Sequence, residues 1–139
     1  MLANTLVTNE VKDSAGAEVE FERLSTEGRS TVFATKSESP AHPYRLSISH
    51  QEIGTGTSRR RRSKVRVDKT VSSTEDTPKN CTVSVYAVLD APVGALAANT
   101  EFKHVLANLL SFLGSTGADT TLKFDCTGTG AVALIDGSI

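Results

Sequence analysis

The chain has 139 residues, of which 38% are apolar and 22% are charged. This length suits one domain with a substantial core, and the composition excludes a disordered chain. No apolar run reaches the roughly 20 residues that a membrane-spanning helix needs, and the first residues lack the pattern of a signal peptide. Two cysteines, Cys81 and Cys126, are too few for a disulfide framework. We expect buried free thiols, with disulfides between subunits as the alternative.

The net charge of −1 conceals an uneven distribution of charge along the chain. Residues 59–79 carry 8 basic and 3 acidic side chains, a balance of +5, whereas the segments before and after each have a balance of −3. A basic block of this kind indicates either a polyanionic partner or a solvated loop.

The N-terminal part of the sequence predicts short antiparallel strands. Residues 4–11 are rich in Thr and Val, residues 13–16 form a turn signal, and residues 17–23 alternate between apolar and acidic side chains. This pattern predicts a hairpin with one solvated face. Residues 31–35 predict a third short strand, and residues 37–43, which hold two prolines, predict a loop.

Three further segments alternate with a period of two residues. They cover residues 44–51, 62–71 and 80–89, and each has aliphatic side chains on one face and polar or basic side chains on the other. Because consecutive strands with short connections usually pair, we expect a meander sheet with one aliphatic face and one polar, basic face.

Residues 99–113 predict an amphipathic helix, with Asn99 or Thr100 capping its start and Gly114 marking its end. The apolar stripe consists of Phe102, Val105, Leu106, Leu109, Leu110 and Leu113. One helix is a thin cover for six strands. We therefore expect a symmetric dimer, with this stripe as its interface and core, in which each subunit lays its helix on the sheet of its partner.

The tail after this helix is less regular. Residues 121–126 are compatible with a strand or a short helix, and the apolar residues 131–135 are expected to dock elsewhere on the chain. We expect a single domain over residues 1–139, with the hairpin and a short strand at 1–36, the meander at 44–90, and the helix and tail at 99–139.

The polar strand face holds the candidate binding residues. Its expected cations are Arg45, Lys64 and Arg66, with Arg59 to Arg62 at the rim, and its small hydroxyls are Ser47, Ser49 and Thr82. Long cations beside small hydroxyls suit the phosphate and the base of an unpaired nucleotide. A solvated face without a partner is the alternative interpretation.

Signatures of enzymes and cofactor sites are absent from the sequence. The glycine pairs Gly54/Gly56 and Gly128/Gly130 lack the lysine and the strand–turn–helix context of a phosphate-binding loop. No nucleophile motif and no spacing of metal ligands is present. We therefore expect no enzymatic activity, no cofactor and no metal.

Three blocks of the sequence resemble the coat proteins of single-stranded RNA bacteriophages, of the levivirus type. Residues 44–51 resemble the first RNA-facing strand of that family, and residues 59–68 resemble the next strand, which follows a basic turn. Residues 83–88 and the helix at 99–113 resemble the last strand and the long helix. The resemblance implies an α+β fold with an N-terminal β-hairpin, an antiparallel β-meander and a C-terminal helix, forming an intertwined homodimer.

The resemblance also implies a function. A coat protein of this type assembles from dimers into the icosahedral shell of the virion, in the cytoplasm of the bacterial host and without a membrane. Its inner sheet face binds genomic single-stranded RNA and an RNA hairpin that marks the genome and represses replicase translation. Two alternatives stay open: a small dimeric RNA-binding protein that does not assemble, and a structural domain whose basic turn is solvated.

Residue roles follow from the resemblance position by position. Ser47 and Ser49 match hydroxyls that line the adenine pocket of the family, Arg66 matches the basic residue beside it, and Arg45 matches a cation that contacts phosphate. Asn80 falls where family members place a stacking tyrosine, and the family's second short helix is not evident in 114–139. The complete expected RNA-binding set is Arg45, Ser47, Ser49, Arg59, Arg60, Arg61, Arg62, Lys64, Arg66, Asp68, Asn80 and Thr82.

Overall fold

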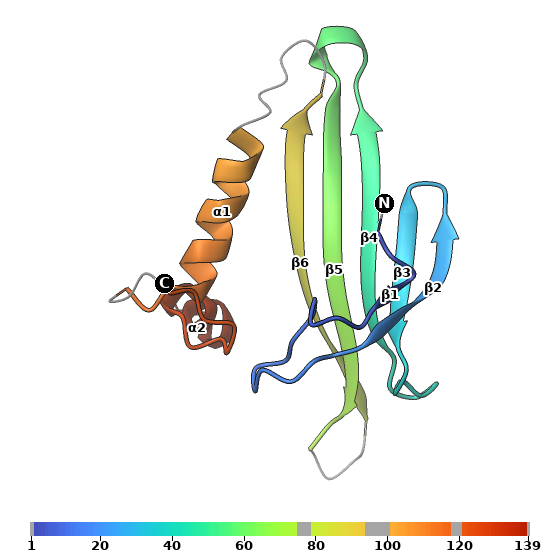
Figure 1. Ribbon diagram of the computed structural model, residues 1–139, viewed down its shortest axis with the longest axis vertical. Helices are drawn as coiled ribbons and strands as arrows, with labels where there is room; N and C mark the ends of the chain where they lie inside the picture. Colours follow the sequence, from blue (N-terminus) through green and yellow to red (C-terminus); the bar gives the residue numbers. More distant parts are fainter. Residues whose placement is uncertain (1, 75–78, 94–100, 118–120, 139) are drawn as a thin grey trace. The chain divides into compact units, whose positions relative to one another are not determined.

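The computed structural model describes residues 2–74, 79–93, 101–117 and 121–138 (Figure 1). The chain divides into two compact units, one made of Met1–Val7 with Glu20–Ala97 and the other of Thr8–Val19 with Ala98–Ile139. The single domain expected over 1–139 stays a prediction. Within the described ranges, no helix has the length and hydropathy that crossing a membrane requires.

The first unit is built on a six-stranded antiparallel sheet in which each strand pairs with the next along the chain (Figure 1). The strands are β1 (Thr5–Leu6), β2 (Phe21–Glu27), β3 (Ser30–Thr35), β4 (Tyr44–Ile53), β5 (Arg60–Ser72) and β6 (Asn80–Pro92). A short 3-10 turn, η1 (Gly56–Ser58), connects β4 to β5. The predicted meander is confirmed, and β4 to β6 extend beyond their predicted ends.

The first predicted strand, residues 4–11, is much shorter in the structure. β1 holds only Thr5 and Leu6, which pair with β2 as the predicted hairpin requires. Asn9 then has φ of 63°, a left-handed conformation that interrupts an extended strand. Pairing resumes only as a single bridge between Lys12 and Glu18.

Buried apolar side chains gather on β1 to β4. Phe21 and Phe33 are fully buried, and the Phe21 ring meets the Tyr44 ring edge-on with the centroids 5.3 Å apart. The Arg23 guanidinium lies 5.7 Å from the centroid of the Phe33 ring. Among the residues that the structure describes, the other buried apolar side chains are Leu6, Ala34 and Leu46 on these strands and Ala91 on β6. This core includes Tyr44 and Leu46, so it fixes the position of β4, one of the three strands that carry the candidate binding residues.

The second unit holds two helices. α1 (Glu101–Gly114) confirms the predicted helix, while its predicted caps Asn99 and Thr100 lie outside the described residues. α2 (Thr129–Asp136) is a second helix in the tail, where the sequence made none evident. The glycine and threonine residues around the start of α2 are typical of a turn, so the sequence pattern did not indicate a helix there.

Residues 121–126 form bends in the structure, and neither the strand nor the short helix expected there is present. Cys126 has φ of 62°, a conformation in which a regular strand or helix does not continue. Both cysteines are free, as expected, but the expectation that they are buried is wrong. Cys81 is exposed on β6 and Cys126 is exposed in this loop.

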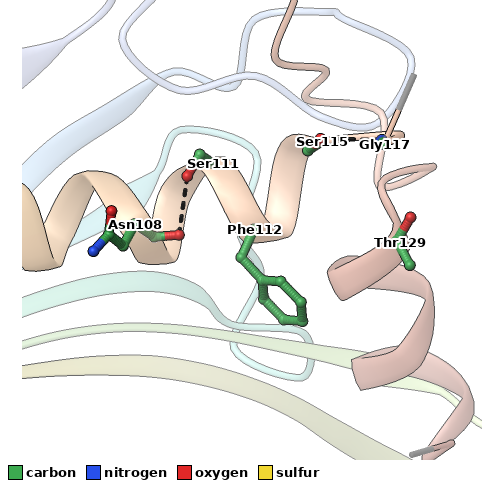
Figure 2. A pocket seen from close by; sticks show the side chains of 6 residues that line it. All are labelled: Asn108, Ser111, Phe112, Ser115, Gly117 and Thr129. Atoms are coloured by element: carbon green, nitrogen blue, oxygen red, sulfur yellow. Dashed lines mark hydrogen bonds between the residues drawn. The ribbon is translucent and has the colours of Figure 1, made fainter. Parts of the chain in front are cut away.

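The two helices approach closely through glycine. Figure 2 shows the Phe112 side chain projecting from α1 toward α2. Phe112 and Thr129 line a hollow of about 470 Å³. A Cβ atom placed on Gly130 would lie 2.6 Å from both the Phe112 ring and the Phe112 carbonyl oxygen. Only glycine fits this crossing without a shift of backbone.

We predict that Gly130→Ala lowers the free energy of unfolding by about 1–3 kcal/mol, the usual cost of overpacking, because it pushes α2 away from α1. Helix propensity alone predicts the opposite sign, since alanine is favoured over glycine by about 1 kcal/mol in a helix. Urea unfolding followed by far-ultraviolet circular dichroism measures the difference. A variant more stable than the wild type would contradict the close crossing.

Candidate nucleic-acid interface

The register of β4, β5 and β6 arranges most of the candidate residues in rows across one face of the sheet, here called the polar face. Residues directly opposite each other on neighbouring strands share a face, with Cβ atoms about 4.5–5.5 Å apart. The three central rows are Ser49–Lys64–Val88, Ser47–Arg66–Tyr86 and Arg45–Asp68–Ser84. The structure therefore brings together both predicted pocket hydroxyls and three of the predicted cations.

Arg66 is held at the centre of this face by two partners. Its Nε donates a hydrogen bond to Oδ1 of Asp68 at 2.7 Å, and its Nη2 donates to Oγ of Ser84 at 3.3 Å. The Ser84 hydroxyl in turn donates to the Asp68 carboxylate. The pKa of Asp68 lies below its ordinary value because Ser84 and Arg66 donate to its carboxylate, against the opposing effect of desolvation.

Tyr86 is the one aromatic side chain in these three rows, and the predicted binding set does not include it. It lies opposite Arg66 on β6, and 65% of its surface is exposed. An exposed ring on a face that carries cations is a platform on which an unpaired base can stack. Strand alternation already assigned residue 86 to the polar face, so the signal was in the sequence.

Asn80 and Thr82 lie outside the three central rows, at the start of β6, opposite Ser72 and Thr70 respectively. The Thr82 hydroxyl is hydrogen-bonded to that of Thr70 at 2.8 Å, and Nδ2 of Asn80 donates to the Ala41 carbonyl at 2.9 Å. Six residues of strand, about 20 Å at 3.3 Å per residue, separate Asn80 from Tyr86. Tyr86, and not Asn80, is therefore the residue opposite Arg66 on β6.

The predicted rim of four arginines is divided between two clusters. Arg60 and Arg62 form ion pairs with Asp90 at 2.8 and 3.1 Å, in the row that continues the polar face. Arg61 pairs in register with Glu52 on the opposite face, and their charged groups lie 3.3 Å apart. Because β5 begins at Arg60, the run follows the alternation of the strand.

The second cluster surrounds Glu52 with three guanidinium groups. Nη1 of Arg29, from the β2–β3 turn, donates to Oε1 of Glu52 at 3.0 Å, and Nη1 of Arg59 lies 3.7 Å from Oε2. The pKa of Glu52 lies below its ordinary value because Arg29 and Arg61 donate hydrogen bonds to its carboxylate. This cluster ties two neighbouring turns of the sheet together.

On β4 to β6, the polar face keeps a surplus of positive charge after its ion pairs are formed. Arg45 lies 3.5 Å from Glu38, Arg66 is paired with Asp68, and Arg60 and Arg62 share Asp90. Lys64 makes no ion pair with any residue that the structure describes. Such a surplus suits a polyanion. Among the residues that the structure describes, no group of three or more His, Cys, Asp and Glu side chains is arranged to hold a metal ion.

Comparisons with known proteins identify the fold. No protein-family model matches the chain, and no curated protein matches it in sequence. Among solved structures, the coat protein of bacteriophage EMS014 has a TM-score of 0.68 at 14% identity, covering 88% of this chain and 89% of that one. The bacteriophage GA capsid protein has a TM-score of 0.55 at 17% identity, covering 98% and 95%.

A third similar structure is the virus-like particle of Wenzhou levi-like virus 4, with a TM-score of 0.57 at 18% identity. The match covers 67% of this chain and 66% of that one. At these identities the likeness establishes the fold. The six-stranded meander followed by a long helix is the RNA phage coat protein fold that the sequence predicted.

We predict that Arg29→Ala raises the pKa of Glu52 toward its ordinary value, and by more than Arg59→Ala does. The two variants lose the same charge, but of these two arginines Arg29 donates a hydrogen bond to Glu52, whereas Arg59 forms an ion pair at 3.7 Å. A depressed carboxyl pKa contributes stability above the unfolded-state pKa, and this contribution is lost as pH falls through the folded-state pKa. Titration of the Glu52 carboxyl carbon-13 signal by NMR measures the pKa in both variants. Equal rises of the pKa would contradict the larger effect expected from the Arg29 hydrogen bond.

Proposed function

We propose that the chain is a viral capsid protein that dimerises, assembles into an icosahedral shell and packages single-stranded RNA on the polar face of its sheet. The observation that carries the capsid role is the likeness to the bacteriophage GA capsid protein along nearly all of both chains. The polar face supports the RNA role, because its rows combine cations, small hydroxyls and an exposed tyrosine. The location proposed is the virion, with assembly in the bacterial cytoplasm.

Exposed apolar side chains support self-association. On the face of the sheet opposite the polar face, Val65, Val83 and Val85 are 44%, 66% and 55% exposed. On α1, Val105 and Leu110 of the predicted stripe are 59% and 54% exposed. Burying apolar surface contributes roughly 25 cal/mol per Å², so covering these faces with a second copy is favourable.

The outer edge of β6 supports the same conclusion. β6 is the last strand of the sheet and has 13 residues, and β5 pairs with only one of its edges. A long, unprotected edge strand is a template for pairing with another chain. Two copies of β6 related by a two-fold axis would pair antiparallel, which extends both sheets into one and joins their polar faces.

The central rows suit an unpaired nucleotide. Tyr86 offers a stacking surface, Arg66 and Lys64 offer charge for phosphate, and Ser47 offers a hydroxyl for the edge of a base. If the nucleotide belongs to a hairpin at the start of a replicase gene, the same contact represses translation and marks the genome for packaging. This proposal includes both roles.

Expression of the full chain in bacteria tests the capsid role. We expect uniform spherical particles by negative-stain electron microscopy, with an absorbance ratio at 260 and 280 nm that shows packaged nucleic acid. Particles without nucleic acid would retain the capsid role and remove the RNA role. A dimer that forms no particles, even after RNA is added at low salt, would favour the small RNA-binding protein instead.

The double variant Arg66→Ala with Ser47→Ala tests the RNA face. We expect its affinity for an RNA hairpin, selected by the wild-type protein from a pool with random loops, to fall by at least about tenfold, since specific base contacts contribute about 1–3 kcal/mol each. The matched control is Arg61→Ala with Ser63→Ala, which removes the same residue types from the other face of β5.

The control loses the same charge, so its loss of affinity measures the general electrostatic effect alone. Size-exclusion chromatography shows whether both double variants remain dimeric. Equal losses of affinity in the two double variants would contradict the assignment of the pocket to the polar face.

A further inference from the structure

We propose that Asp68 and Ser84 are positioning residues, which fix the guanidinium of Arg66 in the orientation that selects an unpaired nucleotide. The proposal rests on the proposed function and concerns how the same face chooses among RNAs. Asp68 belongs to the expected binding set as a residue on the inner face, and Ser84 belongs to no predicted set. In the proposal both act through Arg66 and neither needs to touch RNA.

The hydrogen bonds of Arg66 leave a defined part of it free. A guanidinium has five N–H donors in a rigid plane. Nε is taken by Asp68 and one donor of Nη2 is directed to Ser84, at 2.7 and 3.3 Å. The bond between Ser84 and Asp68 closes the triangle. The remaining donors are therefore held in a fixed plane beside Asp68 and Ser84, in the row next to Ser47 on β4 and Tyr86 on β6.

Fixing this side chain before binding has a thermodynamic consequence. An exposed arginine on a strand otherwise samples many rotamers, and a ligand that needs one of them loses binding free energy in ordering it. A carboxylate and a hydroxyl that hold Arg66 in advance remove much of this loss. The gain goes only to ligands that use the fixed orientation, so it appears as selectivity among RNAs.

The negative charge of Asp68 makes the proposal testable, because electrostatics and positioning predict opposite changes in RNA affinity when Asp68 is removed. A carboxylate on a face that binds RNA repels phosphate, so electrostatics alone predicts that removing it tightens the binding of every RNA. Positioning predicts weaker binding of a selected RNA when the same carboxylate is removed. Ser84 carries no charge, so an effect of its substitution cannot come from the net charge.

The experiment compares two RNA probes with the full-length protein. One probe is the hairpin selected by the wild type from the pool with random loops, and the other is an unstructured oligouridylate. The variants are Asp68→Ala, Ser84→Ala and Ser84→Thr, which keeps the hydroxyl. The matched control is Glu27→Ala, which removes a carboxylate from β2 on the same face, two strands from the pocket. Thermal unfolding checks that each variant is folded.

We expect Asp68→Ala and Ser84→Ala each to lower affinity for the selected hairpin about tenfold, the effect of one good polar contact. Affinity for oligouridylate stays the same or rises, Ser84→Thr behaves like the wild type, and Glu27→Ala tightens both probes. Tighter binding of both probes by Asp68→Ala would overturn the positioning role and leave the RNA role standing. A wild type that binds neither probe would overturn the proposed function, and with it this inference.

Discussion

The unbroken register of β5 between β4 and β6 is the constraint on which the rest of the first unit depends. β5 forms ten consecutive pairs with β4 and thirteen with β6, with no bulge in either ladder. The side chains of a strand alternate between its two faces, so this register alone decides which face each charge occupies. It places Arg66 between Ser47 and Tyr86, and it separates Arg61 from Arg60 and Arg62.

Much of the fold was predictable because alternation is a local signal. The segments at 44–51, 62–71 and 80–89 are half-buried or exposed strands, whose pattern needs no tertiary context. The short β1 and the helix α2 were not predictable in the same way. Asn9 adopts a left-handed conformation that asparagine tolerates but does not require. The start of α2 depends on Gly128, which fits against Leu113 and Gly114, and on Gly130, which fits against Phe112. Both are decided by contacts between distant residues.

The residues of the candidate site were likewise predictable only where they lie in a regular alternating segment. The sequence correctly assigned Ser47, Arg66 and Asp68 to one face, because each lies within a regular alternating segment. It treated Arg59 to Arg62 as one basic rim, since a run of identical residues has no visible period. The structure gives that run two environments, one around Asp90 and one around Glu52. Charge counted along a sequence is therefore a poor guide to charge on a surface.

The regular pairing of β5 also has a consequence for how such a chain can diverge. A substitution on this strand changes one side chain, but the insertion or deletion of a single residue would exchange its two faces from that point onward. Arginines would then occupy the apolar layer and valines the polar one. Over this segment, changes of length are far more damaging than changes of residue type. Drift by replacement at constant strand length is compatible with similar folds at identities of only 14% to 18%.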